Sequence, residues 1–365
     1  MPGDDILDFE WHPALNPVPD AEREIHLVDP GFGKYFTDHM ITVRYSNAKG
    51  WYDAKVEPFG PLMMSPATAV LHYAQEIFEG LKAYRSSEGG ISLFRAEENA
   101  RRFQNSARRM SMPPVPEGLF LRAIEELVTR DKAWVPTSSE SSLYLRPYMI
   151  ATEVFLGVRP SSEYLFGVIA CPVGAYFKGG PQPIKVWISE EFTRAAPGGT
   201  GMAKCGGNYA ASLAAQAEAL AAGCDQVVFL DAVKRRYVEE LGGMNVFFVQ
   251  ENGTLITPPL DGTILPGITR DSVMTLAKEQ GHGVIERPYS VDEWRTDAAS
   301  GRLREVFACG TAATITPIGT LRSRQDEFLI ADGGVGPVTK GLRTTLLDIQ
   351  QGKQSDVHGW VRRIV

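Results

Sequence analysis

The sequence predicts an α/β protein of mixed α+β character that is divided into two domains. Its 365 residues are more than one hydrophobic core usually organises. Segments with strand and helix periodicity alternate in both halves. Three prolines and three glycines between Cys171 and Pro183 forbid regular structure there and indicate a linker. We therefore predict a smaller N-terminal domain over 1–172, an interdomain loop over 173–183 and a larger C-terminal domain over 184–365.

In the first half, apolar and polar residues alternate over 40–45, and a second alternating run follows at the distance of a hairpin partner. Two later stretches carry apolar or small residues at helical spacing, and two more are continuously apolar. The expected strands are 40–45, 51–56, 142–150 and 164–171. The expected helices are 97–110 and 119–129.

The second half is rich in strands with helices between them. Short apolar runs bounded by turn residues predict the strands, and longer runs with helical spacing predict the helices. The expected strands are 184–188, 226–230, 236–240, 245–249 and 305–308. The expected helices are 212–222, 270–279, 291–299 and 342–351.

Composition and charge exclude several functions. A net charge of −7 without a compensating basic block argues against nucleic acid as a partner. The four cysteines form no CxxC and, with six scattered histidines, offer no metal-ligand spacing, so we expect no metal. The acidic start resembles no targeting signal, and no apolar run is long enough for a membrane span. We therefore expect a cytoplasmic protein.

The most informative passage is Gly201–Tyr209, where a single lysine stands among glycines just before a run of small residues. That run predicts a helix, and the start of a helix favours anionic ligands. A lysine so placed suits Schiff-base chemistry, although by itself Lys204 could be an ordinary surface charge. A nucleotide loop is excluded, because Ala203 and Cys205 flank the lysine and no GxGxxG follows a strand.

Three other places carry residues that complement a lysine-bound cofactor. Alternation along a strand puts Glu239 and Glu240 on opposite faces, and one of them could favour the protonated form of a pyridine ring. The turn over 258–267 feeds a helix whose first amides form an anion site. The turn over 309–313 offers a hydroxyl and close amides to a phosphate. Taken singly, these could be solvated glutamates, a helix capped by Thr269, and a plain turn.

Together these strings match a known family. KCGGNY, EELGGMN, TPPLDGTILPGITR and EVFACGTAA, in this order, closely resemble the branched-chain amino-acid aminotransferases, which are pyridoxal-phosphate enzymes of fold type IV. The resemblance continues through IFEGLKAYR at 77–85, LFRAEEN at 93–99, SLYLRP at 142–147 and CPVGAYF at 171–177. It implies a homodimer of two-domain subunits, with pyridoxal 5'-phosphate at the domain interface.

The resemblance also implies roles for residues around the cofactor. Lys204 would form the Schiff base and then move the proton between the substrate and cofactor carbons. Glu240 would pair with the pyridine nitrogen, and Tyr209 would hydrogen-bond near the phenolic oxygen. The phosphate would be held by Arg102, the amides of Ile268 and Thr269, and Thr311. Arg102 is preferred to the adjacent Arg101 because of its spacing from 93–95.

For the substrate, the resemblance implies an apolar pocket with a polar edge. Tyr73, Tyr144 and Arg146 would meet the carboxylate of glutamate, while their rings pack against aliphatic side chains. Amides near Gly243 and Ala312 would bind the α-carboxylate, and Leu156 and Val158 would reach the neighbouring subunit's site. The pocket itself would be shaped by Phe32, Phe78, Tyr176, Met244 and Ala312.

The implied reaction is a reversible ping-pong transfer of the amino group from L-leucine, L-isoleucine or L-valine to 2-oxoglutarate. The partners are therefore amino acids and 2-oxo acids. Two alternative functions are those of a D-amino-acid aminotransferase and an aminodeoxychorismate lyase, which share the lysine and the glutamate. A third alternative is a non-catalytic pyridoxal-phosphate-binding protein. Ala313 and Thr316 stand where some relatives carry a redox CxxC, so thiol control is not expected. Gly243 replaces a bulkier residue of some members, so the resemblance does not define the shape of the pocket floor.

Overall fold

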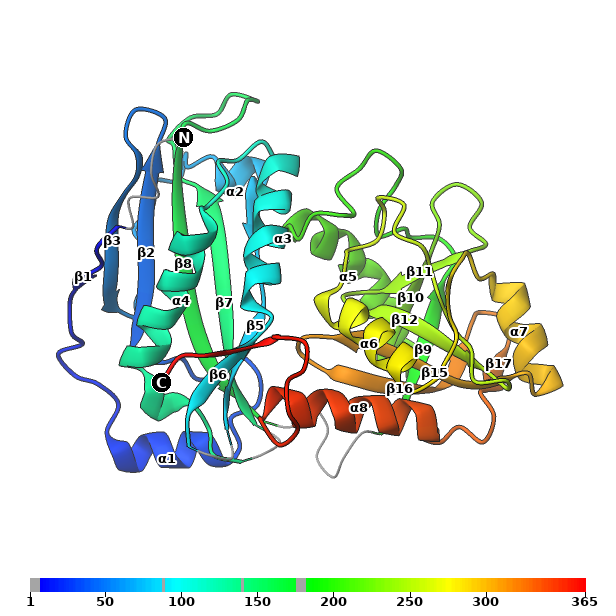
Figure 1. Ribbon diagram of the computed structural model, residues 1–365. Coiled ribbons are helices and arrows are strands. Elements are labelled where there is room, and N and C mark those ends of the chain that lie inside the picture. Colours follow the sequence, from blue (N-terminus) through cyan, green and yellow to red (C-terminus); the bar gives the residue numbers. More distant parts are fainter. Residues whose placement is uncertain (1–6, 87–88, 139–140, 175–181) are drawn as a thin grey trace. The chain divides into compact units, whose positions relative to one another are not determined.

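The computed structural model describes residues 7–86, 89–138, 141–174 and 182–365 (Figure 1). The chain divides into two compact units, which are described separately. The first comprises Met1–Tyr176, Ala203–Gly206 and Ile349–Val365, and the second comprises Phe177–Met202 and Gly207–Asp348. This division differs from the predicted one, because two segments that we assigned to the C-terminal domain group with the first unit.

Hydrogen bonds explain both reassigned segments. The C-terminal strand β18 (Val361–Arg363) pairs antiparallel with β6 (Ile91–Phe94) and so extends the first sheet. Arg362 adds ion pairs to Glu97 at 2.9 Å and Glu125 at 2.7 Å. The segment Ala203–Gly206 is held by backbone and side-chain groups of the first unit, as described below. The compact units thus differ from the predicted domains at these two segments, and the domain bounds stay a prediction.

The first unit is built on a mainly antiparallel sheet of nine strands among the described residues, in the order β1-β3-β2-β8-β7-β5-β6-β18, with β4 paired to β7. The expected hairpin is β2 and β3, and the two longest strands, β7 and β8, lie in the middle. The bounds are β1 Glu10–Trp11, β2 His39–Ser46, β3 Gly50–Pro58, β4 Glu76–Phe78, β5 Leu81–Arg85, β7 Ser142–Ala151 and β8 Glu163–Val173.

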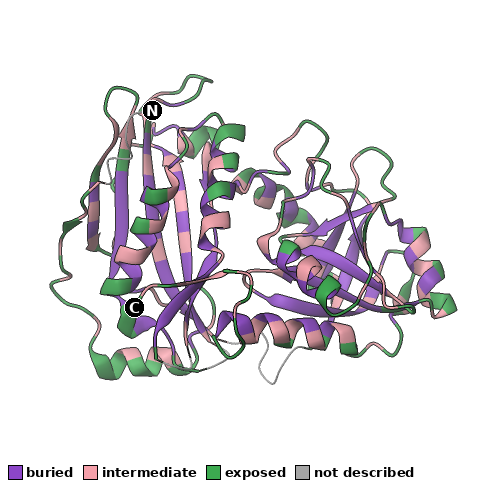
Figure 2. Cartoon of the chain, in the orientation of Figure 1, coloured by how far each residue is buried: buried purple, intermediate pink, exposed green. Residues whose placement is uncertain are grey.

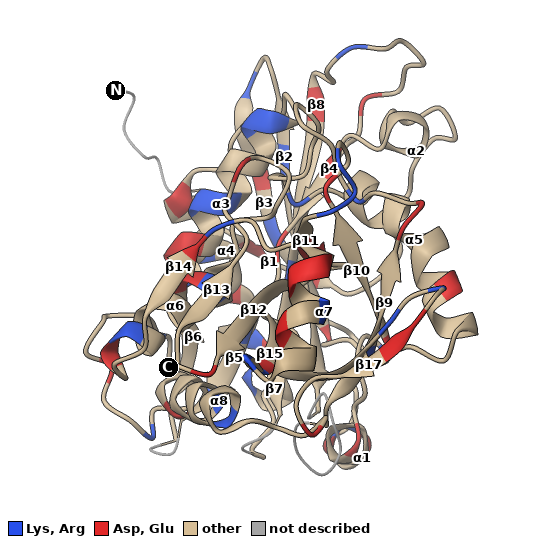
Figure 3. Cartoon of the chain, turned by 90° about the vertical axis from the view of Figure 1, so that its right-hand side faces the viewer, with Lys and Arg blue, Asp and Glu red and all other residues tan. Residues whose placement is uncertain are grey.

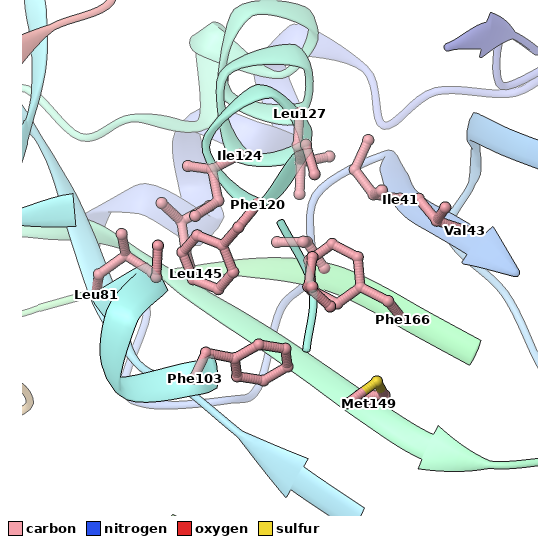
Figure 4. Packing of buried hydrophobic residues seen from close by; sticks show 14 of the residues in the cluster. Ile41, Val43, Leu81, Phe103, Phe120, Ile124, Leu127, Leu145, Met149 and Phe166 are labelled. Atoms are coloured by element: carbon pink, nitrogen blue, oxygen red, sulfur yellow. The ribbon is translucent and has the colours of Figure 1, made fainter. Parts of the chain in front are cut away.

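Two helices, α3 (Ala96–Arg109) and α4 (Glu117–Arg130), carry the core of this unit. The buried residues of α4 recur at helical spacing, so one stripe of the helix faces the sheet. Figure 4 shows Phe120, Ile124 and Leu127 pointing at strand residues such as Phe166. The ring centroids of Phe120 and Phe166 lie 6.0 Å apart. Shorter helices are α1 (Asp20–Val28), α2 (Val70–Tyr73) and a 3-10 turn, η1 (Lys132–Trp134).

The second unit is built on another sheet, with nine described strands in the order β11-β10-β9-β16-β15-β12-β13-β14 and β17 paired to β16. Its central pairs β10–β9 and β9–β16 are parallel, whereas β16–β15–β12 is antiparallel. The bounds are β9 Ile184–Ser189, β10 Gln226–Leu230, β11 Val238–Leu241, β12 Asn245–Gln250, β13 Leu255–Thr257, β14 Val284–Glu286, β15 Leu303–Gly310, β16 Thr314–Arg322 and β17 Glu327–Leu329.

Both faces of this second sheet are covered. On β10, Val227 and Phe229 pack with Ala215 and Ala219 of α5 (Gly206–Ala221). Val228 and Leu230 lie on the other face, in a cluster that contains Trp294 of α7 (Val291–Ser300). The remaining helices are α6 (Ile268–Glu279) and α8 (Pro337–Gln350). Figure 2 shows the resulting pattern, with buried strands and helices that are buried along one side.

All the expected strands and helices are present, with shifted ends. The largest shift is at α5, which begins six residues before the predicted start, because the glycines after Lys204 already adopt helical geometry. Arg236 and Tyr237 precede β11 instead of belonging to it. In the view of Figure 3, basic and acidic positions are interspersed. No helix of the described residues is long and apolar enough to cross a membrane.

Candidate active site

Lys204 is fixed through its backbone. Its amide donates to Ser106 Oγ of α3 at 2.9 Å, and its carbonyl accepts from the amide of Phe78 at 3.0 Å. Its ammonium lies 4.9 Å from the centroid of the Phe78 ring, and the residue is half-buried. Because the backbone is held on both sides, the amine occupies a defined position in the first unit.

Arg102 lies on the buried face of α3, whereas Arg101 lies on the exposed face and pairs with Glu98 and Glu117. Successive helix positions differ by about 100°, so only one of the two adjacent arginines can face inward. Arg102 donates to both oxygens of Glu79, at 2.7 and 2.9 Å. Of the two arginines, Arg102 is therefore the buried one, and its role at a phosphate stays a prediction.

Glu79 is a buried carboxylate that the sequence did not single out. It is fully buried and also accepts from the side-chain amide of Asn99 at 2.7 Å. Burial alone would raise the pKa of Glu79, but the guanidinium of Arg102 outweighs it, with help from Lys204 and Asn99, and the net pKa falls below its usual value. Glu79 therefore stays ionised beside both cations.

Around Phe78 the first unit gathers three other predicted substrate residues, Phe32, Tyr144 and Arg146. The Arg146 guanidinium carbon is 4.6 Å from the Phe78 ring centroid, and Nη2 of Arg146 donates to the Tyr144 hydroxyl at 3.0 Å. The rings of Tyr144 and Phe32 lie 5.0 Å apart. Nε of Arg146 is buried and has no hydrogen-bond partner among the described residues. A buried donor without a partner is the feature that a carboxylate ligand would satisfy.

Other predicted substrate residues of this unit are at the surface. The Tyr73 hydroxyl donates to the Leu156 carbonyl at 2.5 Å, and both side chains are exposed. Val158, two residues further, is also exposed. Tyr176 lies outside the described residues.

In the second unit, Glu240 is held by three donors. Arg194 pairs with its Oε1 at 2.5 Å, the Leu265 amide donates to the same oxygen at 3.2 Å, and Asn245 donates to Oε2 at 3.4 Å. Arg194 is itself anchored to the carbonyl of Thr263. Both side chains of the ion pair are buried, so the carboxylate has one orientation. A lone arginine in a loop gives no sequence signal, and Arg194 was not predicted.

The two predicted phosphate turns are both at element ends. Gly267 is the N-cap of α6, and no side-chain hydrogen bond from the described residues caps this helix, so Thr269 is not its cap. A Cβ on Gly267 would collide with Oδ1 of Asn245, which explains the need for glycine. Thr311 follows the end of β15, in the turn to β16.

The remaining predicted residues of this unit converge on Gly243. A Cβ built there would lie 3.5 Å from the Tyr209 ring, so the tyrosine is in contact distance of the turn. A Cβ on Gly310 would lie 3.3 Å from the Met244 side chain, which places the turn before Ala312 beside the same segment. Tyr209, Met244 and the turn that carries Thr311 and Ala312 are thus brought together.

Glu239 faces the other side of β11 and is 6% exposed. Burial raises the pKa of its carboxyl to about 7, with the hydrogen bond from Thr263 opposing the rise. A carboxyl whose pKa is higher in the folded chain than in the unfolded chain destabilises the fold as the pH rises from about 4.5 towards 7. Below that window the group contributes its full stability.

We therefore predict that Glu239→Gln raises the melting temperature relative to wild type as the pH increases. Glutamine cannot ionise, so the difference should grow by about 2 °C or more between pH 5 and pH 8. Differential scanning fluorimetry at one-unit steps measures it, with the exposed Glu251→Gln as the control. A difference that stays constant across this range would contradict the prediction.

The described residues contain no group of three metal-ligating side chains. Cys171, Cys205, Cys224 and Cys309 are buried, and each is a free thiol. Burial raises the pKa of the Cys309 thiol to about 12, so this thiol is not a nucleophile at neutral pH.

Comparison with known proteins assigns the family. The model of the family described as amino-transferase class IV matches residues 76–321. The branched-chain-amino-acid aminotransferase of Mycobacterium tuberculosis strain H37Rv is 55% identical over 98% of both chains. The branched-chain-amino-acid transaminase 1 of Bacillus subtilis strain 168 is 46% identical over 95% of this chain and 99% of its own.

Solved structures agree with these sequence relatives. The branched-chain amino acid aminotransferase from Escherichia coli is 30% identical, with a TM-score of 0.73 over 90% of this chain and 99% of its own. The enzyme from Thermobaculum terrenum, solved in its PLP-form, is 26% identical, with a TM-score of 0.71 over 90% of this chain and 98% of its own. The predicted fold type is confirmed, and this chain belongs to the class IV aminotransferases, on the branch of the branched-chain amino-acid aminotransferases.

Proposed function

We propose that this protein is a pyridoxal-phosphate-dependent aminotransferase that moves the amino group of L-leucine, L-isoleucine or L-valine to 2-oxoglutarate. The observation that carries the proposal is Lys204, whose backbone is anchored on both sides beside Phe78. A held amine next to an aromatic wall and a buried arginine is suited to Schiff-base chemistry on a carboxylate-bearing substrate.

The residues fit pyridoxal 5'-phosphate chemically. Lys204 supplies the amine for its aldehyde, and Glu240, held by Arg194, supplies a carboxylate for the ring nitrogen. Arg102 and the start of α6, with the amides of Ile268 and Thr269, supply donors for the phosphate, as does the Thr311 hydroxyl. When bound, the cofactor provides an electron sink for the bond that breaks at the α-carbon of the substrate.

Residues of the chain would transfer the proton and hold the groups around the cofactor in place. Nζ of Lys204 would take the proton from the α-carbon of the amino acid and hold it for its return. Glu240 would favour the protonated form of the ring nitrogen, and Tyr209 would donate near the phenolic oxygen. Glu79 keeps Arg102 oriented through two parallel hydrogen bonds.

Arg146 would allow the same site to accept both aliphatic amino acids and glutamate. Its guanidinium stacks on Phe78 and holds the Tyr144 hydroxyl, so the same wall is apolar for leucine and cationic for glutamate. Its Nε, which has no partner among the described residues, is the donor that the side-chain carboxylate of glutamate would use. Met244, Gly243 and the amides near Ala312 would bind the substrate from the second unit.

We also propose a cytoplasmic homodimer. Leu156 and Val158 are 62% and 91% exposed, and an aliphatic pair at this exposure suits a contact with a second copy at whose site it would act. Unpaired cysteines fit a reducing compartment.

The visible spectrum of the purified enzyme tests the proposed reaction. L-Leucine should bleach the band of the bound cofactor, 2-oxoglutarate should restore it, and D-alanine should leave it unchanged. A band that responds to D-alanine and ignores L-leucine would instead indicate a D-amino-acid aminotransferase. A band that responds to no amino acid would indicate a non-catalytic binding protein.

Arg146→Met sharpens the same experiment. The half-reaction with L-glutamate should slow about 10- to 100-fold more than that with L-leucine, because only glutamate loses a charged hydrogen bond. The exposed Arg304→Met serves as the matched control and should affect neither half-reaction. Equal losses for both amino acids would contradict the role of Arg146.

A further inference from the structure

The second unit contains a cavity of about 380 Å³ beside β11. Val238 and Glu239 of β11 line this cavity, whereas Glu240 does not. The cavity is within the size range of small-molecule sites. Most of its wall is aliphatic and comes from Val233, Val238, Pro258, Pro259, Ile264 and Pro288.

Two acids that line the cavity, the buried Glu239 and the exposed Asp261, share one hydroxyl. Oγ1 of Thr263 is 2.7 Å from Oε1 of Glu239 and 2.8 Å from Oδ1 of Asp261. The hydroxyl has a single hydrogen and can donate to only one of these oxygens. The carboxylate oxygens of the two acids therefore outnumber the single hydrogen that Thr263 can donate to them.

One oxygen of these two acids lacks a donor. Oε2 of Glu239 is buried and has no hydrogen-bond partner among the described residues, although the side chain is more than nine-tenths buried. Buried oxygens of this kind are rare, because an unmade hydrogen bond costs about 1–3 kcal/mol. A donor brought by a ligand would satisfy it, and an ammonium group would satisfy both acids at once.

The lining of the cavity also contains a cation. Lys234 is exposed, with its ammonium 5.5 Å from the Tyr237 ring centroid. The nearby Asp231 is not available to a ligand in the same way, because its oxygens already accept from the amides of Lys234, Arg236 and Tyr237. The cavity is thus lined by two acids, one cation and aliphatic side chains.

From these lining groups we propose a second binding site, for small aliphatic α-amino acids, in the cavity beside β11. The ammonium group of the ligand lies on Glu239 and Asp261, its carboxylate lies on Lys234, and its side chain packs against the proline-rich wall. The site shares no side chain with the residues proposed for catalysis.

Binding to the holoenzyme tests the site once the catalytic chemistry is blocked. Borohydride treatment links the cofactor to Lys204 permanently, and 2-methyl-L-leucine, which has no α-hydrogen, is the probe. Isothermal titration calorimetry should show saturable binding to wild type. Glu239→Gln should weaken it at least tenfold, Val233→Trp should abolish it by filling the cavity, and Glu251→Gln should bind like wild type.

A second probe isolates the role of Lys234. Lys234→Met should weaken the binding of 2-methyl-L-leucine severalfold but should leave isopentylamine unaffected, since this amine has no carboxylate. The melting temperatures of all variants verify folding. The proposal is overturned if wild type shows no saturable binding, or if Val233→Trp and Glu239→Gln bind the probe as tightly as Glu251→Gln. Failure of the proposed transaminase function would appear in the unreduced enzyme with L-leucine and is therefore a separate result.

Discussion

Replacement of Lys204 by alanine is expected to reduce transamination of L-leucine by at least about a thousandfold, because the residue is both the amine for the cofactor and the base at the α-carbon. The loss should not come from misfolding. Both hydrogen bonds that fix this residue, from the amide to Ser106 and from Phe78 to the carbonyl, use backbone atoms that alanine retains.

Two measurements separate a chemical role from a structural one. Stopped-flow absorbance with L-leucine gives the rate of the half-reaction, and mass spectrometry after borohydride reduction detects the cofactor fixed on the chain. Lys204→Ala should lose both signals at an unchanged melting temperature. The exposed Lys340→Ala is the matched control and should keep both. Activity near that of wild type in Lys204→Ala would sink the assignment.

Local sequence indicated a helix after the lysine but not where it begins. The small residues of α5 predict the helix, whereas the glycines after Lys204, which are typical of a turn, already belong to it. The burial of Arg102 and exposure of Arg101 follow from helix geometry, once the start of α3 is known. Short-range periodicity therefore predicts the presence of a helix better than its first residue.

Long-range pairing was not predictable in the same way. β18 joins β6 from the opposite end of the chain, and no local pattern in 361–363 indicates that partner. β16 was missed because Pro317 and Gly319 are typical of loops, yet Pro317 pairs with Phe307 in the middle of the sheet. The partners of Glu240 were missed for a related reason: Arg194 comes from a loop far away in the chain.

Glu240→Gln tests what that long-range partner achieves. Oε1 of Glu240 accepts from Arg194 and from the Leu265 amide, so the carboxylate is oriented before any ligand binds. Glutamine has nearly the same shape, but it has no charge with which to hold a ring nitrogen in its protonated form. We expect the rate of the L-leucine half-reaction to fall about a hundredfold, while the affinity for pyridoxal 5'-phosphate falls much less.

The contrast between rate and affinity identifies the role. A purely structural role for Glu240 would lower the melting temperature and the cofactor affinity together with the rate, because buried Arg194 would lose its partner. If the role is electrostatic, Glu240→Gln lowers the rate more than the melting temperature or the cofactor affinity. Restoring the charge with Glu240→Asp should then recover part of the rate. Glu251→Gln, which removes an exposed carboxylate, should change none of the three quantities. If Glu240→Gln reacts with L-leucine as fast as wild type, protonation of the ring does not depend on this carboxylate.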